Sequence, residues 1–282
     1  MKINLDEYVK VTDYFDIQNM LRDLMQEVHL ICEEHNLTYN LFAGTLLGAV
    51  RHGDIIPWDD DIDITMPRPD YDRFREIVLE KYSDKFNLCS YPMDNYIYEY
   101  MKFCNKDTVL TENLVKDKYN ILGVFIDIFP IDGVPEDSKI IDKMYKNVMK
   151  NKRKAILCTY KNAMSPVWWK KPYFFVRMLQ SAIYNIKGYK YYIKKQIDEA
   201  TKYPFETSER VGLIEFGTWC KKGIVPKREY LDRKKYKFGQ YEFWGVADAH
   251  KCLTTLYGDY MTPPPEEKRI PKHNFDLYIK KR

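Results

Sequence analysis

The sequence predicts an α/β (α+β) fold in which helices flank a mixed sheet and a basic helical segment is inserted. Segments with apolar residues every three or four positions, typical of amphipathic helices, occur between segments with alternating polar and apolar residues, typical of strands. A long segment in the middle of the chain has a helical pattern and is rich in lysine. The 282 residues, 45% of them hydrophobic, suffice for one large core.

Helices and strands alternate through the first part of the chain. Apolar residues recur at helical spacing from Asp16 to Glu34, so we expect an amphipathic helix there. A strand from Thr38 to Phe42, a short helix closed by Gly53 and a strand in the segment DIDITM are predicted to follow. Pro67 and Pro69 should end that strand.

The later segments are predicted from the same two patterns. RPDYDRFREIVLEKY is predicted to be a helix capped near Asp70, and one or two strands are expected between Tyr91 and Asn105. The segment LGVFIDIFPIDGVP alternates like a strand that stops at Pro130. Helices are predicted near Val246 to Tyr257 and Pro265 to Lys268.

Positive charge is concentrated in the inserted segment. The net charge of the chain is only +4, so we expect no nucleic acid as a partner. Between Lys139 and Lys195 there are fifteen basic residues and one acidic residue, within a helical pattern that runs from Ser138 to Ala200. We therefore expect residues 1–137 to form the core, residues 138–210 a basic helical insertion, and residues 211–282 the C-terminal part of the core domain.

The cysteines and the apolar runs bear on where the protein is found. Six scattered cysteines lack the spacing of zinc or redox motifs, and the N-terminus lacks a secretion signal, so we expect a cytoplasmic protein. No apolar run is long enough to cross a bilayer. Basic and aromatic residues adjoin in the insertion, as at Trp169 and Lys170, which favours peripheral binding to anionic lipid at the inner membrane face. A solvated helical face is the alternative.

The segment DIIPWDDDIDI carries an unusual density of acids. Asp61 and Asp63 are two positions apart on a predicted strand, so their carboxylates point to one face and repel each other unless a cation lies between them. Mg²⁺ suits such a pair, with Mn²⁺ as the alternative ion, because it takes carboxylates, water and phosphate oxygens. Asp127, on a later strand, can either complete the site or take a proton from a nucleophile.

Three other interpretations of these acids compete with a magnesium site. A solvated turn leaves unexplained why Asp63 and Asp127 lie within apolar strands, where a lone acid is costly. A calcium-binding EF-hand is disfavoured because Ile64 replaces the glycine at the sixth position and Asp70 replaces the glutamate at the twelfth. The Asp-x-Asp of sugar-nucleotide glycosyltransferases is a short signal that occurs often by chance.

Gly44 and Thr45 lie between a predicted strand and a predicted helix. The N-terminus of a helix presents unpaired N–H groups and partial positive charge, which binds phosphate. The order of strand, Gly-Thr, helix and Asp-x-Asp resembles the active-site pattern of the nucleotidyltransferase superfamily. Taken without the acids, Gly44 and Gly48 fit equally well as turn and packing glycines.

A narrower family is indicated by longer motifs. GTLLGAVRHGDIIPWDDDIDI resembles the core motif of the LicD family, FIDIFPIDGVP its second block and YGDYMTPPPEEKR its C-terminal block. The resemblance covers roughly Asp16 to Pro135 and Gly212 to His273, and the basic segment between them has no recognised counterpart. Asp54 occupies a position where family members often have a second glycine. The position lies in a predicted loop, so this difference does not weaken the resemblance.

The resemblance implies a catalytic core of nucleotidyltransferase type and a metal-dependent phosphotransferase. Family members resemble phosphocholine transferases, so the expected reaction moves phosphocholine from CDP-choline to a sugar hydroxyl of a cell-surface glycan or lipid-linked glycan. Teichoic acid, lipopolysaccharide and capsule precursors are the expected acceptors. The alternatives are transfer of ribitol or glycerol phosphate from another CDP-alcohol, glycosyl transfer from a nucleotide sugar, and a non-enzymatic glycan-binding module with a structural cation.

The resemblance also implies roles for the acids and their neighbours. Asp61, Asp63 and Asp127 become metal ligands and catalytic residues, with Asp127 the candidate base. Gly44 and Thr45 become contacts of the donor's phosphates.

Four further residues are predicted to bind substrate. Arg51 would clamp diphosphate oxygens, and His52 would either join it or contact the end of its helix. Lys102 is a further phosphate candidate. Trp58, directly before the acids, would contact the choline ammonium through cation–π attraction, or else pack under the loop.

Overall fold

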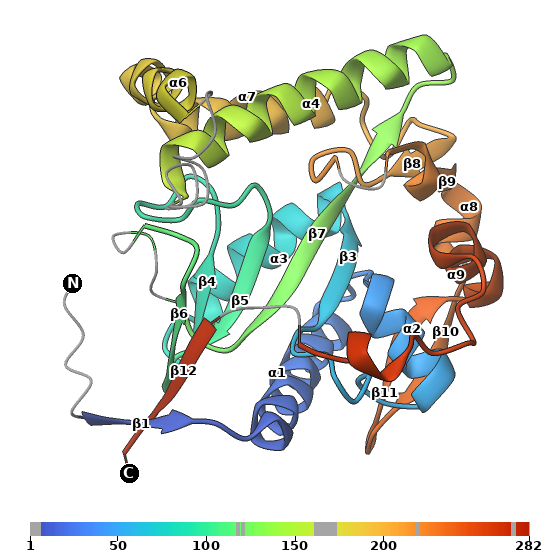
Figure 1. The fold of residues 1–282 in the computed structure, drawn as a ribbon. Helices are drawn as coiled ribbons and strands as arrows, with labels where there is room; N and C mark the ends of the chain where they lie inside the picture. Colours follow the sequence, from blue (N-terminus) through green and yellow to red (C-terminus); the bar gives the residue numbers. More distant parts are fainter. Residues whose placement is uncertain are drawn as a thin grey trace.

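The computed structural model describes residues 7–116, 119, 122–160, 174–217, 220–271 and 275–281. Within these ranges a central mixed sheet is flanked by helices, and three further helices lie together along one side of the molecule (Figure 1). The predicted α/β class, with a mixed sheet flanked by helices, is confirmed.

Helices and strands occur along the whole of the described chain. The helices are α1 (Tyr14–Glu34), α2 (Ala43–His52), α3 (Arg68–Lys81), α4 (Ser138–Thr159), α6 (Phe174–Lys187), α7 (Tyr189–Ala200), α8 (Lys227–Leu231) and α9 (Ala249–Tyr257), with short 3-10 helices η4 (Cys220–Gly223) and η5 (Glu266–Lys268). The strands are β1 (Tyr8–Val11), β2 (Asn40–Leu41), β3 (Asp63–Pro67), β4 (Phe86–Cys89), β5 (Met101–Asn105), β6 (Thr108–Glu112), β7 (Phe125–Val134), β8 (Arg210–Gly212), β9 (Val225–Pro226), β10 (Arg233–Phe238), β11 (Tyr241–Val246) and β12 (Phe275–Lys280).

The central sheet has the strand order β2-β3-β7-β5-β4. Strands β3 and β7 run parallel, whereas β2, β5 and β4 each pair antiparallel with their neighbours. Strand β8 pairs with the far end of β7, and β9 pairs with β8. Strands β1, β12 and β6 form a separate antiparallel sheet, and β10 and β11 form a hairpin (Figure 1).

One face of the central sheet is buried under α1 and α3. Ile64 of β3, Ile126 and Ile128 of β7 and Phe74 of α3 all lie in this core without solvent exposure. Side chains alternate between the two faces of a strand, so the residues between these isoleucines point to the opposite face. The acids of β3 and β7 therefore share that opposite face.

The predicted first helix is confirmed as α1. It begins slightly earlier than expected, because the Asp13 side chain accepts a hydrogen bond from the backbone N–H of Phe15 at 2.9 Å and caps the helix. The apolar stripe of α1, which includes Leu21, Met25 and Val28, is buried in the core. Packing of this stripe on the sheet explains why a helix with so many charged residues on its other side is stable.

The strand predicted over Thr38–Phe42 is shorter in the structure and contains only β2. The backbone N–H of Thr38 donates to Asp70 Oδ2 at 2.9 Å instead of to a strand, and Phe42 is already the N-cap of α2. Asp70 lies in the first turn of α3 but does not cap it. Pro69 is also within that turn, where the missing N–H of proline is tolerated.

The prediction that the last long strand stops at Pro130 is wrong, because β7 continues to Val134. The N–H of Asp127 donates to Ile62 O, so the N–H groups of odd-numbered residues face β3, and the nitrogen of Pro130 faces the other edge. On that edge β5 pairs only as far as Ile128 and β8 only from Asp132. Proline thus occupies a position where the ladder needs no donor.

The basic segment predicted to be an insertion contributes α4, α6 and α7, which lie together along one side of the molecule (top of Figure 1). The helical pattern predicted from Ser138 to Ala200 is confirmed where the structure describes it, whereas residues 161–173 lie outside the described residues. Strand β4 and the β10–β11 hairpin were not predicted. The hairpin packs Phe238 and Phe243 into the main core.

A buried charged cluster joins the end of β3, β7 and the segment after β8. The guanidinium of Arg68 contacts both oxygens of Asp132, at 2.7 and 2.8 Å, and Glu215 Oε2 at 2.6 Å. Asp132 and Glu215 are each 1% exposed. Burial raises the pKa of Glu215 to about 8, partly offset by Arg68 and reinforced by Asp132. With a pKa of about 8, Glu215 is mostly protonated at neutral pH although it contacts a guanidinium.

We expect the free energy of unfolding of the wild type to fall between about pH 5 and about pH 8, because the unfolded chain releases the Glu215 proton at the ordinary glutamate pKa and the folded chain retains it. Glu215→Gln has no proton to lose, so it should gain stability relative to the wild type as the pH rises, by up to a few kcal/mol. Denaturant unfolding at both pH values measures this. Equal destabilisation of the variant at both would mean that Glu215 is ionised and paired with Arg68.

Candidate active site

The strand register brings the predicted acids of two strands side by side. Asp63 of β3 lies opposite Asp127 of β7, and Lys102 of β5 lies opposite Asp127 on its other side. Lys102 Nζ donates to Asp127 Oδ1 at 2.7 Å, and both side chains are buried. The buried lysine compensates one of the two neighbouring carboxylates, which makes this charge pair part of the fold as well as of the site.

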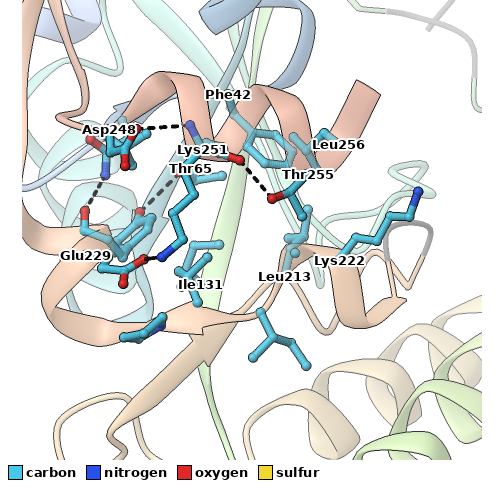
Figure 2. Close-up of a pocket in the computed structure, with 18 of the residues that line it drawn as sticks. Phe42, Thr65, Ile131, Leu213, Lys222, Glu229, Asp248, Lys251, Thr255 and Leu256 are labelled. Carbon is cyan, nitrogen blue, oxygen red and sulfur yellow. Dashed lines mark hydrogen bonds and ion pairs between the residues drawn. The ribbon is translucent and has the colours of Figure 1, made fainter. Parts of the chain in front are cut away.

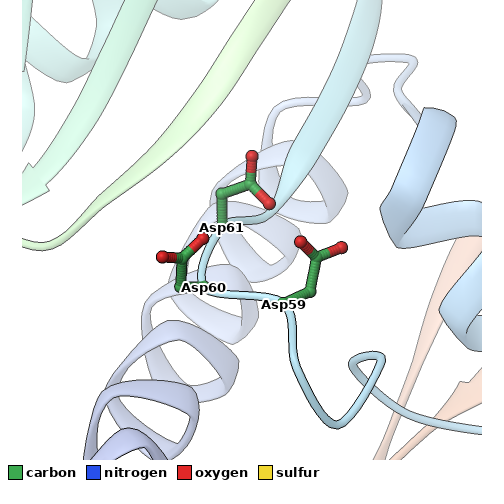
Figure 3. A group of neighbouring side chains, drawn as sticks. All are labelled: Asp59, Asp60 and Asp61. Atoms are coloured by element: carbon green, nitrogen blue, oxygen red, sulfur yellow. The ribbon is translucent and has the colours of Figure 1, made fainter. Parts of the chain in front are cut away.

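The loop before β3 adds three consecutive acids. Oxygen atoms of Asp59, Asp60 and Asp61 lie within 4.8 Å of one another (Figure 3). Gln18 of α1 holds this loop, since its Nε2 donates to the carbonyl oxygens of Ile56 at 3.2 Å and Asp59 at 2.9 Å. A buried polar residue of the first helix therefore holds the backbone of this loop.

Gly44 and Thr45 build the other wall of this acidic region. A Cβ atom at Gly44 would lie 2.9 Å from Asp59 Oδ2, so any side chain there would displace that carboxylate. The Thr45 hydroxyl accepts a hydrogen bond from the backbone N–H of Asp63 at 2.8 Å. The start of α2 thus packs directly against the acids. This contact explains why a glycine and a hydroxyl-bearing threonine occupy positions 44 and 45.

Electrostatic repulsion among the acids is strongest at Asp63. Burial raises the pKa of Asp63 well above its ordinary value, and the charges of Asp61, Asp127 and Asp59 raise it further, whereas Lys102 lowers it. Burial also raises the pKa of Tyr257, and the charges of Asp63 and Asp59 add to the effect, so Tyr257 lies within the range of their charges. The charges of the neighbouring carboxylates thus disfavour the ionised form of Asp63.

Arg51, His52 and Trp58 form a separate group that joins the C-terminal block. Arg51 Nη1 donates to the carbonyl oxygen of Tyr260 at 2.7 Å, and burial, then the charge of Arg269, lowers the Arg51 pKa. The Trp58 ring contacts His52 edge to face, with centroids 5.9 Å apart, and the Arg269 guanidinium lies 5.4 Å from the Trp58 centroid. Trp58 therefore already has a cation of the protein over its ring.

The structure thus brings together Asp61, Asp63 and Asp127 with Gly44, Thr45 and Lys102. Sequence reasoning missed Asp59, Gln18, Tyr257 and Arg269 as neighbours of the site. The C-terminal motif that contains Tyr257 and Arg269 was the available signal, but only the fold reveals what it contacts. Trp168, Trp169, Trp219 and His273 lie outside the described residues.

A cavity of about 330 Å³ lies on the acid-bearing side of the sheet (Figure 2). Phe42, Ile131 and Leu213 give it an apolar lining, while Glu229 and Lys251, joined by a 2.7 Å ion pair, gather with Asp248 on one side. Thr65 reaches it from β3, two positions beyond Asp63. The cavity is therefore close enough to the acids to serve the same substrate complex.

The chain is similar to proteins of one family. The family model described as the LicD/FKTN/FKRP nucleotidyltransferase domain matches residues 36–169. The lipopolysaccharide cholinephosphotransferase LicD of Haemophilus influenzae is 32% identical over 265 residues, which are 91% of this chain and 94% of that protein. An uncharacterized protein of Rickettsia prowazekii is 34% identical over 35% of this chain and 40% of its own length. The human ribitol 5-phosphate transferase FKRP is 50% identical over 44 residues, 16% of this chain and 9% of its own length.

The fold, the acidic site and these similarities define the class of protein as a phosphotransferase. The chain belongs to the LicD family, and it is an enzyme of the LicD type. In the part of the chain that the structure describes, no helix is both long enough and apolar enough to cross a membrane.

Trp58→Ala should release the C-terminal block from α2, because it removes the ring that contacts both His52 and Arg269. We expect the free energy of unfolding to fall by about 2 kcal/mol, as for other partly buried aromatic residues. We also expect limited proteolysis to cleave the segment between Tyr257 and Arg269 faster. Trp58→Phe keeps a ring and is the matched control. Unchanged melting and cleavage in Trp58→Ala would contradict the packing role.

Proposed function

We propose that the protein transfers phosphocholine from CDP-choline to a sugar hydroxyl of a cell-surface glycan and releases CMP. The observation that carries the proposal is the similarity over 91% of the chain to a lipopolysaccharide cholinephosphotransferase. The pairing of Asp63 with Asp127 beside Gly44 and Thr45 supports it. Phosphoryl transfer needs hydrogen-bond donors to the phosphate oxygens close to charged groups that stabilise the transition state. Lipopolysaccharide, teichoic acid and capsule precursors are the proposed acceptors.

The carboxylate oxygens of the site are suitable ligands for a divalent cation. Asp59 and Asp61 offer oxygens close together, and the pKa of Asp63 is raised by burial and by the charges of three neighbouring carboxylates. Hard carboxylate oxygens are the ligands that Mg²⁺ and Mn²⁺ prefer. Asp61 and Asp63 would hold the ion, with Asp59 or Asp127 as the third ligand. When bound, Mg²⁺ would neutralise charge on the donor diphosphate.

The residues of the chain account for the rest of the reaction. The acceptor hydroxyl oxygen would form a bond to the phosphorus that carries choline, and the bond from that phosphorus to the bridging oxygen would break, so that CMP leaves. Asp127 would take the acceptor proton, held in place by Lys102. The N–H groups of Ala43 and Gly44 would contact phosphate oxygens, since those of Thr45 and Leu46 already donate to the Phe42 carbonyl oxygen. Arg51 and His52 lie further along the same helix.

Transfer of ribitol phosphate from a CDP-alcohol is the second candidate. The 44-residue match to a ribitol 5-phosphate transferase, at 50% identity, favours it for the part of the chain it covers. The relative that covers nearly the whole chain acts on choline phosphate, so phosphocholine is the first choice. Mass spectrometry of a glycan incubated with each donor separates the two, since the masses of the added groups differ.

Asp61→Asn and Asp63→Asn should each lower metal-dependent CMP release from CDP-choline by about a hundredfold or more, because each removes a charge that holds the ion. The melting temperature should stay equal or rise slightly, since repulsion among the acids is relieved. Asp84→Asn, an exposed residue after α3, is the control for loss of one carboxylate. Full activity of either site variant at saturating Mg²⁺ would refute the metal site.

We also propose peripheral binding to anionic lipid through the insertion. Basic side chains from α4 and α6 line a groove between these helices; they are Lys146, Lys150, Arg153, Lys154 and Arg177. Next to it, α6 exposes an apolar stripe in which Leu179 is 62% and Ile186 is 83% exposed. Positive charge beside exposed apolar side chains matches the surface of an anionic bilayer.

The double variant Leu179→Glu, Ile186→Glu should weaken binding to vesicles that contain phosphatidylglycerol by roughly tenfold or more, because two apolar side chains no longer enter the bilayer. Co-sedimentation measures this, and binding should be lost at high salt. Leu79→Glu, at an exposed leucine of α3, is the matched control. Equal binding to neutral and anionic vesicles, or none to either, would exclude this surface.

A further inference from the structure

A second cavity, of about 400 Å³, lies between the sheet and the helical insertion. Its floor includes Tyr100 and Phe125, and its roof includes residues of α4 and α7. Phe125 precedes Asp127 by two positions on β7, so it belongs to the face of the sheet that carries the acids. Helices α4 and α7 thus cover a cavity on the acid-bearing face of the sheet, two positions along β7 from Asp127.

Lys102 lies between this cavity and Asp127. Its Nζ is 2.7 Å from Asp127 Oδ1, and it also lies 5.0 Å from the ring centroid of Tyr98 and 5.5 Å from that of Tyr100. Both tyrosines line the cavity. If a substrate phosphate contacts Lys102, a group attached to that phosphate can reach the aromatic side chains that line the cavity.

The lining has the composition of a site for an organic cation. The described lining residues include six aromatic rings, those of Tyr98, Tyr100, Phe125, Tyr160, Phe216 and Phe275. The charged ones are Glu99, Glu112 and Lys152, with a formal charge of −1. Lys152 is paired with Glu99 at 2.7 Å, and Glu112 accepts a hydrogen bond from the Tyr98 hydroxyl at 2.6 Å. Aromatic faces together with a carboxylate attract quaternary ammonium groups.

Gln196 supplies a buried acceptor to the same cavity. It lies on α7 without solvent exposure, and its Nε2 donates to the carbonyl oxygen of Tyr192 at 3.4 Å. Its Oε1 has no hydrogen-bond partner among the described residues. A buried oxygen left in this state is costly unless a ligand meets it, and the polarised methyl groups of a trimethylammonium are weak donors to such an oxygen.

We infer that this cavity holds the trimethylammonium group of the donor, an assignment that rests on the proposed transfer of phosphocholine. The phosphate meets Lys102, the rings of Tyr98 and Tyr160 surround the methyl groups, and Glu112 supplies the opposing charge. A metal ion is disfavoured because it prefers oxygen ligands to ring faces. Trp58 stays the alternative choline contact, because a protein cation lies over both rings: Arg269 is 5.4 Å from the Trp58 centroid and Lys102 Nζ is 5.0 Å from that of Tyr98.

The test compares CDP-choline with its neutral isostere, in which carbon replaces the choline nitrogen. The wild type should prefer CDP-choline by about tenfold or more in kcat/KM, because the rings and Glu112 act on charge and not on shape. Glu112→Gln keeps the shape of the side chain, which is only partly buried, and should remove most of that preference. Its kcat/KM for the neutral donor should stay within about twofold of the wild-type value.

Two further variants give the experiment its controls. Tyr98→Leu removes a ring and should also lower the preference, whereas Tyr98→Phe keeps the ring and should retain more of it. Glu80→Gln removes an exposed carboxylate of α3 that lies away from both cavities, and it should leave the choline preference unchanged. Calorimetric titration with choline chloride adds a readout that needs no turnover, and the wild type should bind choline more tightly than its neutral isostere.

Three other outcomes would contradict either the cavity assignment or the proposed function. An unchanged preference in folded Glu112→Gln and Tyr98→Leu, or equal calorimetric affinity of the wild type for choline and its isostere, would overturn the cavity assignment and leave phosphocholine transfer standing. A raised KM for the glycan acceptor alone would assign the cavity to the acceptor sugar. A wild type that uses CDP-ribitol and neither binds choline nor releases CMP from CDP-choline would overturn the proposed function as well.

Discussion

The parallel register of β3 and β7 is the constraint on which the site depends. It fixes Asp63 opposite Asp127, and because β5 pairs in register on the other side, it also fixes Lys102 beside Asp127. A slip of one residue would turn the acids into the apolar core and the isoleucines toward the site. The core that forms under α1 and α3 therefore enforces the arrangement of the charged groups.

The grouping of carboxylates in the site is electrostatically unfavourable. Burial and three neighbouring carboxylates disfavour the charge on Asp63, whereas the buried Lys102 favours it. Gln18 of α1 holds the backbone of the acidic loop in place through the carbonyl oxygen of Asp59. Stability alone would not select such a cluster, since apolar residues would cost less at these positions. Such a group of carboxylate oxygens is instead consistent with the divalent cation that we propose for the donor complex.

The helical insertion has two different sides in the structure. Its inner side, through α4 and α7, covers the aromatic cavity over the acid-bearing face of the sheet, and Lys152 of α4 reaches Glu99 near the start of β5. Its outer side exposes the basic groove and the apolar stripe of α6. One helical segment therefore carries both part of the lining of the proposed choline cavity and the surface that we propose to bind lipid.

The sequence by itself determined what depends on local pattern. Apolar periodicity predicted α1, α2 and β3, and the acids stood out because Asp63 and Asp127 interrupt apolar strands. Tertiary structure decided the rest, because it depends on pairing between distant segments. Pro130 continues a strand only because neither neighbour needs its N–H there, and Arg269 meets Trp58 only because the C-terminal block folds back on α2. Lys102 could be named from the sequence, but its ion pair with Asp127 follows from strand register, which no local pattern encodes.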